Sequence, residues 1–396
     1  MNILRLTTRI YPDEGGPAVY AYNLSKNLSD SSYRFINLSC QPPRIRYRAK
    51  KVNSNFLIFY MPLRIPSVDD TLTKKMIFIF KFIFYSLRSI LKIRHKYRID
   101  LIHCDNPAIT GIVATIMKCF FKIPFLYTQH GIESPYKLEK LIETRFIYKL
   151  SSNYLIISRK MKRFFVNSIK DPKKLIYIPN GVKISDFFHV SDQIEKQNII
   201  NKLKLSSIVQ SDDYIIIYIG YMIFQQKVKG MIDFLHGFNS LLKDLDTKHK
   251  RKIKLLYIGD GKFLDILEME ISKLKLNENA FILGRKSNVK EYYAIADLCT
   301  LTSYVEGFPT VLLEAIASKV PCLATNIGEI KQIIHESALV KPGDIMQIKE
   351  KLRNFMFDHQ FAENNLKISI ELLKDYDWEV IGKKIKNTYL NALNIY

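Results

Sequence analysis

The stretch that decides the fold of this chain is Ser303-Tyr304-Val305-Glu306-Gly307-Phe308-Pro309-Thr310-Val311-Leu312-Leu313-Glu314-Ala315. It follows a short apolar run at residues 298–301, which has the length and composition of a buried strand. Gly307-Phe308-Pro309 is typical of a turn, and the apolar spacing after it is that of a helix opening at Thr310. The stretch therefore predicts a strand, a turn and a helix, the unit from which parallel sheets are built.

The same stretch carries groups that suit an anion and a diol. Free backbone N–H groups in the first turn of a helix opening at Thr310 suit an anion such as a diphosphate. Glu306 falls in the loop, and Glu314 falls at least one turn into the helix, where a carboxylate can accept two hydrogen bonds from a diol such as ribose. Two glutamates at this spacing also occur on helices without a site, so the turn between them carries the interpretation.

Strand and helix patterns alternate along the whole chain, as expected of parallel sheets covered by helices. A polar stretch at residues 191–211 divides them into two series, and 396 residues also fit two domains. The first series predicts strands at residues 3–7, 35–38, 56–60, 101–104, 125–128, 154–157 and 175–178, with helices such as 18–28, 110–120 and 159–167. The second predicts strands at residues 214–219, 253–258, 280–283, 298–301, 321–324 and 338–340. Ligands bind beyond the carboxyl ends of such strands, so two facing sheets would share one central cleft.

Charge is the strongest signal in the composition. The formal net charge is +22, and residues 1–190 hold 32 Lys and Arg against 12 Asp and Glu, whereas the remainder holds 28 against 26. Such a basic half suits nucleic acid, an anionic membrane surface or a phosphate-bearing acceptor, and a merely solvated lysine-rich face is the alternative.

The cysteines and the start of the sequence bear on the compartment. Cys40, Cys104, Cys119, Cys299 and Cys322 are scattered without a C-x-x-C pair, which argues against a disulfide framework or a zinc cage. No apolar leader precedes the strand-like start, so export is not expected. We expect a cytoplasmic protein with reduced cysteines.

Residues 71–98 combine an intensely apolar run, residues 76–85, with basic flanks that include Lys74, Lys75, Arg88 and Lys92. The run is too short to span a bilayer, which needs about 20 apolar residues. A helix lying in the interface of an anionic membrane fits the pattern, and a helix buried against the first sheet with a basic outer face is the alternative.

Glu306 and Glu314, separated by seven residues around a Gly-Phe-Pro turn, resemble the corresponding pair of glycosyltransferase family 4 in the GT-B class. The resemblance implies two Rossmann-like domains, residues 1–190 for the acceptor and 191–375 for the nucleotide sugar. It further implies that Glu314 binds the ribose hydroxyls. Glu306 and the backbone of Gly307, Phe308, Pro309 and Thr310 would contact the transferred sugar and its phosphates.

Other segments are similar to the family along nearly the whole chain. Gly15-Gly16-Pro17 looks like its glycine loop, although a plain turn also explains it. Thr128-Gln129-His130-Gly131 matches its histidine position, which implies that His130 touches the sugar and the donor phosphate. Pro179-Asn180-Gly181-Val182 resembles the turn that closes the first domain, and residues 376–396 resemble the helix that crosses back to it.

Lys229-Gly230 resembles the family's lysine-glycine helix start, with Lys229 reaching the diphosphate. A lysine there neutralises the leaving nucleotide as the glycosidic bond breaks. The sequence departs from the family at Gly220-Tyr221, where the family has Gly-Arg. Lys227 is our hypothesis for the replacement of that cation.

Two further patterns are weak. Ile258-Gly259-Asp260-Gly261 is half of a dinucleotide fingerprint, with Leu264 where the third glycine would stand. Asp244-Leu245-Asp246 and Asp375-Tyr376-Asp377 are D-x-D runs in charged helical contexts. We expect neither a metal ion nor a cofactor.

The resemblance thus implies a retaining, metal-independent hexosyl- or N-acetylhexosaminyltransferase, with His130, Glu306 and Lys229 as its electrostatic clamp. By resemblance it moves a sugar from a UDP- or GDP-sugar to a lipid-linked or saccharide acceptor at the inner face of the membrane. The product would be a cell-surface polysaccharide such as O-antigen, capsule or lipopolysaccharide. A sugar-nucleotide epimerase of GT-B type and a basic nucleic-acid-binding α/β protein are the alternatives.

Overall fold

The computed structural model describes the chain except for residues 14, 44, 68–69, 132–140, 167–171 and 395–396. It divides into two compact units, Met1–Asn180 with Trp378–Tyr396, and Gly181–Asp377. The chain passes from the first unit to the second within the predicted turn at residues 179–182, before the polar stretch that follows residue 190.

The first unit contains an eight-stranded sheet with the order β3-β4-β2-β1-β5-β6-β7-β8. All its pairings are parallel except that of β3 with β4. The strands are β1 Asn2–Leu6, β2 Arg34–Cys40, β3 Ala49–Asn53, β4 Phe56–Met61, β5 Leu101–Asp105, β6 Phe125–Gln129, β7 Asn153–Ile156 and β8 Leu175–Tyr177. β3 was not predicted from the sequence, because this edge strand is mostly exposed and includes two lysines instead of an apolar run.

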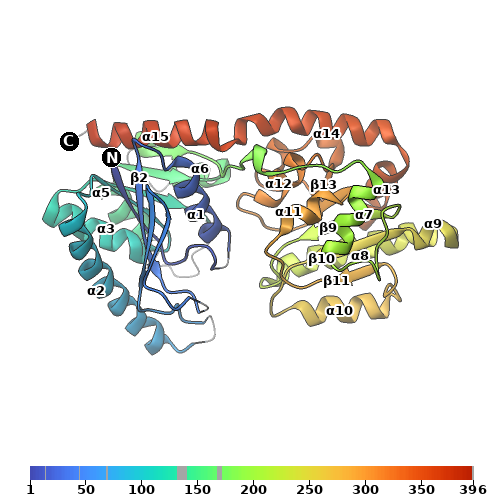
Figure 1. Cartoon of the computed structure of the whole chain (residues 1–396), viewed down its shortest axis with the longest axis horizontal. Helices are drawn as coiled ribbons and strands as arrows, with labels where there is room; N and C mark the ends of the chain where they lie inside the picture. The colour runs from blue at the N-terminus through green and yellow to red at the C-terminus, as the bar shows by residue number, and fades with distance from the viewer. Residues whose placement is uncertain (14, 44, 68–69, 132–140, 167–171, 395–396) are drawn as a thin grey trace. The chain divides into compact units, whose positions relative to one another are not determined.

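Helices cover both faces of this sheet (Figure 1). α1 Gly16–Leu28 and α15 Trp378–Asn394 lie on one face, where Leu24 and Ile385 pack with Phe35 in the core. α2 Leu72–Lys96 and α3 Ala108–Phe121 lie on the other face. The shorter elements are a π-helix at Ile142–Ile147, α5 Tyr148–Leu150, α6 Arg159–Val166 and a 3₁₀ turn at Pro172–Lys174.

The second unit contains a six-stranded, fully parallel sheet with the order β11-β10-β9-β12-β13-β14. The strands are β9 Tyr214–Ile219, β10 Ile253–Ile258, β11 Ala280–Ile282, β12 Leu298–Leu301, β13 Cys322–Thr325 and β14 Leu339–Val340. Each lies at a predicted position, because buried parallel strands are short apolar runs that the sequence alone reveals.

The helices of the second unit lie on both faces of its sheet (Figure 1). They are α7 Gln193–Lys202, α8 Gln225–Lys243, α9 Thr247–Arg251, α10 Leu264–Lys273, α11 Val289–Ala294, α12 Thr310–Ala317, α13 Ile345–Phe357 and α14 His359–Leu373. Short 3₁₀ turns lie at Ile184–Asp186, Ile330–Gln332, Glu336–Ala338 and Lys374–Tyr376. The polar stretch at 191–211 is therefore not a plain linker, since Asp192 caps α7 by accepting the Glu195 N–H at 2.8 Å.

Both sheets reverse their strand order beside their first strand, between β1 and β5 and between β9 and β12. Loops that follow the strands on either side of such a reversal diverge and leave a crevice where ligands bind. The predicted α/β fold with two parallel-sheet domains is confirmed. Each sheet has one reversal point, and these two points are the candidate positions for a binding site.

The final helix belongs to the first unit. Trp378, Ile381, Ile385 and Tyr389 recur along one face of α15 and are all buried. Gly382 lets α15 approach α1, since a Cβ there would lie 3.2 Å from Leu28.

Candidate functional site

A buried ion pair lies at the reversal point of the first sheet. Arg5 stands in the middle of β1, and its guanidinium contacts the Asp105 carboxylate at the end of β5 at 2.5 Å. Neither side chain is exposed to solvent. Burial by itself would raise the pKa of Asp105, but Arg5, together with His130 and His103, holds that pKa below its usual value. Asp105 is therefore a carboxylate with a fixed orientation.

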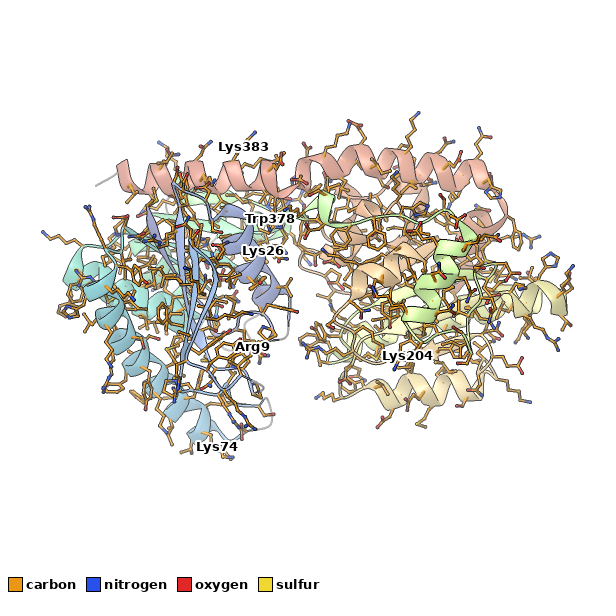
Figure 2. All side chains as sticks on the ribbon, in the orientation of Figure 1. Arg9, Lys26, Lys74, Lys204, Trp378 and Lys383 are labelled. Carbon is orange, nitrogen blue, oxygen red and sulfur yellow. The ribbon has the colours of Figure 1, made fainter. Side chains whose placement is uncertain are left out.

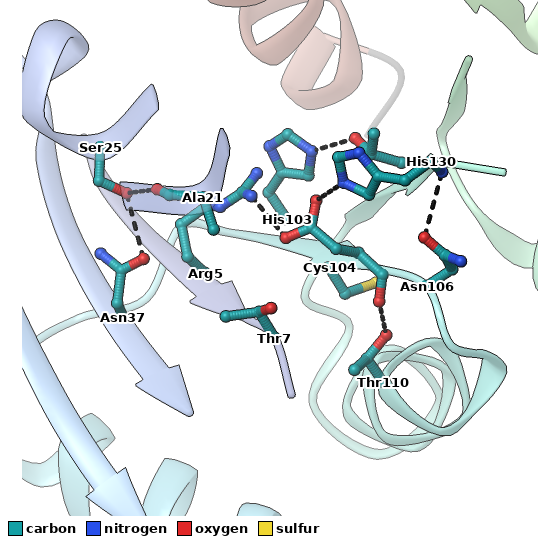
Figure 3. Close-up of polar contacts among 12 residues, drawn as sticks. Arg5, Thr7, Ala21, Ser25, Asn37, His103, Cys104, Asn106, Thr110 and His130 are labelled. Atoms are coloured by element: carbon teal, nitrogen blue, oxygen red, sulfur yellow. Dashed lines mark hydrogen bonds and ion pairs between the residues drawn. The ribbon is translucent and has the colours of Figure 1, made fainter. Parts of the chain in front are cut away.

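His130, which follows β6, contacts the other oxygen of the same carboxylate (Figure 3). Its Nε2 lies 3.0 Å from Asp105 Oδ1, and its backbone N–H donates to Asn106 Oδ1 at 3.1 Å. The imidazole and the Tyr20 ring meet in a T-shaped contact, with 4.8 Å between centroids. These contacts hold the predicted histidine in one orientation, as a hydrogen-bonded carboxylate does for catalytic and metal-binding histidines.

A second histidine lies behind this group. Thr128 Oγ1 and the Tyr389 hydroxyl each lie 2.7 Å from one ring nitrogen of His103, which is fully buried. Burial, and next the charge of Arg5, hold the pKa of His103 well below its usual value, so the ring is neutral. Tyr389 brings the C-terminal helix into this polar cluster.

Arg5, Asp105, His103 and Tyr389 were not predicted from the sequence as site residues. Two signals were present: a charged residue inside the apolar run Ile3-Leu4-Arg5-Leu6, and Asp105-Asn106 directly after a predicted strand. A buried charge in a strand requires a partner, and only the pairing of β1 with β5 shows which carboxylate supplies it.

The predicted glycine loop lies at the start of α1, where Gly15 is the cap residue and Gly16 and Pro17 are the first two residues of the helix. Gly15 has φ +103°, which side-chain-bearing residues rarely adopt, and it directly precedes the helix. A Cβ on Gly16 would meet no heavy atom within 4 Å, so the backbone there borders open space. The loop leaves room for a ligand to approach the start of α1.

The reversal point of the second sheet gathers most of the predicted donor residues. Lys227, in the first turn of α8, donates to Glu306 Oε2 at 3.3 Å, and its Nζ lies 3.2 Å from Oε1. Lys229 Nζ lies 4.5 Å from the centroid of the Tyr304 ring, whose hydroxyl donates to Asp233 at 2.6 Å. Lys227, Lys229 and Glu306 therefore border the loops after β9 and β12.

Close packing fixes α8 against the end of β12. A Cβ on Gly230 would lie 2.0 Å from the carbonyl oxygen of Thr302, so only glycine fits. The Thr302 hydroxyl donates to the Gly230 carbonyl at 2.6 Å, and the Thr302 N–H donates to the Tyr218 hydroxyl at 3.1 Å. The glycine after Lys229 is thus explained by the approach of the helix to the strand.

α12 begins at Thr310, as predicted, with Pro309 at its cap position and no side chain capping it. Glu314 is half-buried on this helix, and its Oε2 lies 3.1 Å from the Tyr293 hydroxyl. Burial raises the pKa of Glu314 to about 7, although the Tyr293 hydrogen bond and the charge of Lys290 lower it. The carboxyl is poised to change protonation near neutrality.

The turn before α12 is held by its aromatic residue. Phe308 is buried, and its ring packs on Tyr376 with 5.5 Å between centroids. Its side chain therefore packs inward and anchors the turn. The rest of the turn consists of Gly307 and Pro309, and Thr310 begins α12. Within the second unit the structure brings Lys227, Lys229, Glu306 and the start of α12 to one reversal point, whereas His130, Gly15 and Gly16 lie in the first unit.

The weak patterns have structural roles. Cβ atoms on Gly259 and Gly261 would lie 1.8 Å from the Gly220 carbonyl oxygen and 2.4 Å from the Met222 backbone, so these glycines let two loops pack together. Asp244 pairs with Lys349 at 2.8 Å, and Asp246 caps α9 by accepting the His249 N–H at 2.9 Å. Within the described ranges, no three His, Cys, Asp or Glu side chains gather as a metal site would require.

Comparison with known proteins identifies the family of this chain. The family model described as Glycosyltransferase Family 4 matches residues 14–186, and that described as Glycosyl transferases group 1 matches residues 200–368. N-acetyl-alpha-D-glucosaminyl L-malate synthase of Bacillus anthracis is 24% identical over 378 residues, 91% of this chain and 90% of the relative.

Two further similarities cover much of the chain. UDP-Gal:alpha-D-GlcNAc-diphosphoundecaprenol alpha-1,3-galactosyltransferase of Escherichia coli is 21% identical over 78% of this chain and 76% of its own length. The structure of sucrose-phosphate synthase from Thermosynechococcus elongatus superimposes with a TM-score of 0.80 at 18% identity and covers 100% of both chains. With both family models matched and the fold shared, the chain belongs to the family 4 glycosyltransferases of GT-B fold.

Proposed function

We propose that this glycosyltransferase moves a hexosyl or N-acetylhexosaminyl group from a nucleoside diphosphate sugar to a lipid-linked acceptor, with retention of the anomeric configuration. The observation that carries the proposal is the grouping of Lys227, Lys229 and Glu306 beside the start of α12 at the reversal point of the second sheet. Uridine diphosphate is the first nucleotide to test, because the Escherichia coli relative is named for UDP-Gal.

Glu314 is the proposed ribose ligand. As a carboxylate it accepts hydrogen bonds from two hydroxyl groups, and its place on α12 lies beyond the helix start that suits phosphate oxygens. Lys227 and Lys229 supply positive charge for the diphosphate, so that negative charge is stabilised as the bond to the sugar breaks.

The family has an arginine at the position of Tyr221. In this proposal Lys227 supplies the positive charge of that arginine. Lys227 pairs with Glu306 in the structure, and in this proposal the donor diphosphate takes Lys227 from that carboxylate. Glu306 is then free to accept hydrogen bonds from hydroxyl groups of the transferred sugar. Lys227 and Glu306 thus neutralise each other before the donor binds.

Retention follows if acceptor and leaving group share one face of the sugar. The bond from the anomeric carbon to the phosphate oxygen breaks, the bond to the acceptor oxygen forms, and the acceptor proton passes to the departing phosphate. His130, which Asp105 orients, is the proposed contact to the sugar and its phosphate. Protein cations stabilise the phosphate charge in this scheme, which requires no metal ion or other cofactor.

The acceptor is proposed from the charge of the first unit and from one relative. The Escherichia coli relative is named for a diphosphoundecaprenol acceptor, a lipid with a diphosphate, and the basic residues of this chain are concentrated in residues 1–190. Synthesis of a cell-surface polysaccharide at the inner face of the cytoplasmic membrane fits both. Nucleic acid is not a proposed partner.

The test is a transfer assay with a panel of UDP- and GDP-sugars, with and without undecaprenyl diphosphate-linked N-acetylglucosamine. Release of nucleotide that requires the acceptor, unchanged by EDTA, with an α-linked product by NMR, is the expected result. Interconversion of donor sugars without an acceptor would show an epimerase. An inverted product would remove the proposed mechanism while leaving the transferase.

A further inference from the structure

The side of α2 that faces away from the first sheet carries large apolar side chains. The buried side of this 25-residue helix is a narrow stripe of Phe82, Ser86, Ile90 and Ile93. On the other side Phe80 is 68% exposed and Phe84 58% exposed. Folded monomers rarely leave such a row of apolar side chains in water unless something covers it.

These exposed apolar residues form one row along the helix. Ile77, Phe80, Phe84 and Leu91 are all exposed and follow one another at spacings of three, four and seven residues. Residues at such spacings lie on the same face of an α-helix. Among the described residues no helix is long and apolar enough to cross a membrane, so this row belongs to a helix that does not span.

A cationic row runs beside the apolar one. Lys74, Lys81 and Arg88 are exposed and spaced by seven residues, and Lys92 is exposed one turn further on. Figure 2 shows Lys74 projecting outward at the start of α2, where it pairs with Asp70 at 3.0 Å. From residue 71 to residue 99 the sequence contains no Asp or Glu, so Lys81, Arg88 and Lys92 have no acidic neighbour on their own helix.

The same character continues onto the end of α3. Phe120 is 78% exposed, and Phe121 packs under Arg94 of α2, whose guanidinium carbon lies 4.1 Å from the ring centroid. Residues 106–132 also contain no Asp or Glu. We call the exposed faces of α2 and of the end of α3 the α2 surface.

We propose that the α2 surface docks on an anionic lipid bilayer, with α2 lying in the headgroup layer and Phe80 and Phe84 inserted. Apolar and cationic rows side by side match the boundary between acyl chains and anionic headgroups. If a second copy of this chain packed on the α2 surface, the cationic rows of the two copies would come close together. Repulsion between these like charges would disfavour such a dimer. The inference stands apart from the proposed chemistry, because it concerns binding in the absence of donor and acceptor.

The experiment measures binding to vesicles of phosphatidylcholine alone and of phosphatidylcholine with phosphatidylglycerol. The wild-type protein is expected to cosediment with the anionic vesicles only. Lys81→Gln/Arg88→Gln/Lys92→Gln should weaken partitioning about 100-fold, since each cation near an anionic leaflet contributes a factor of about five. Phe80→Ser/Phe84→Ser should bind at low salt and be released by added salt, because only the electrostatic attraction remains.

Lys243→Gln/Lys248→Gln/Arg251→Gln is the matched control, since it removes three exposed cations from the second unit. It should bind anionic vesicles as the wild type does, and circular dichroism melts should show that every variant is folded. Equal binding by the α2 variants and the wild type would overturn the proposal. A wild-type dimer that the phenylalanine substitutions convert to a monomer, without vesicle binding, would assign the surface to a second copy.

Discussion

Asp105 makes two contacts with different roles. It pairs with the buried Arg5, and it orients His130. Removing its charge leaves a buried guanidinium without compensation, which in other proteins costs about 3–5 kcal/mol of unfolding free energy. The residue is therefore structural for the first sheet and positioning for the histidine.

We predict that Asp105→Asn lowers the free energy of unfolding by about 3 kcal/mol, measured by urea denaturation. The control is Glu371→Gln, which removes the exposed ion pair with Lys374 and should change stability by less than about 1 kcal/mol. A loss for Asp105→Asn as small as that of the control would show that the buried pair contributes little.

Glu314 gives a pH prediction whose sign follows from its raised pKa. The unfolded chain loses this proton near the usual glutamate value, whereas the folded protein holds it up to a pH of about 7, so stability is lost as the pH rises between these two values. Glu314→Gln should therefore stabilise the ligand-free protein at pH 8, on the order of 2 kcal/mol, and leave it nearly unchanged at pH 4. Thermal melts across this range measure the difference, and a constant difference would contradict the raised pKa.

The affinity for the donor nucleotide should rise with pH, whereas the stability falls. If the ribose hydroxyls donate to ionised Glu314, wild-type affinity for UDP falls as the pH drops below about 7. In Glu314→Gln the affinity should be lower by at least about tenfold and independent of pH in this range, because one strong acceptor is lost. Calorimetric titration with UDP at pH 6 and pH 8 provides the measurement.

The contribution of Lys227 to UDP binding can be measured separately from that of other lysines of α8. Lys227→Gln should weaken UDP binding by about 10- to 100-fold, as expected when a charge-assisted hydrogen bond to phosphate is lost. Lys243→Gln, at the far end of the same helix, should bind as the wild type does. If Lys227→Gln binds UDP normally, another group neutralises the diphosphate.

At the scale of elements, one glycine sets how closely α8 approaches β12. Gly230→Ala places a methyl group where a Cβ would lie 2.0 Å from the Thr302 carbonyl oxygen, so the helix must shift. We expect a stability loss of about 2 kcal/mol and weaker UDP binding, because Lys227 and Lys229 move with the helix. Gly16→Ala, whose Cβ meets open space, is the control and should keep wild-type stability in the same denaturation experiment.

At the scale of the whole molecule, the first of the two units is completed by α15, the last helix in the described part of the chain. α15 packs with strands and helices of the first unit through Trp378, Ile385 and Tyr389, all buried. Trp378→Ala should destabilise the first unit by about 3–5 kcal/mol, as large buried aromatics do. In calorimetry we expect the transition of the first unit to move to lower temperature while that of the second unit stays, and a uniform shift of both would contradict two separately stabilised units.

The sequence by itself determined the local features, because they depend on neighbouring residues. The apolar runs of the buried strands, the start of α12 at Thr310 and the glutamates around its turn can be identified from patterns a few residues long. The exposed strand β3 could not be found this way, since its pairing with β4 rather than an apolar run forms it. Family resemblance added the roles of His130 and Lys229, which a single histidine or lysine does not show.

Only the tertiary structure decided which distant residues act together. Arg5 and Asp105 lie 100 positions apart in the chain, and His103 and Tyr389 lie 286 apart. Their contacts depend on which strands are neighbours in the sheet and on where the last helix packs, and no local pattern encodes either. The same holds for the α2 surface, because an apolar helix shows its exposed side only when the sheet has covered the other.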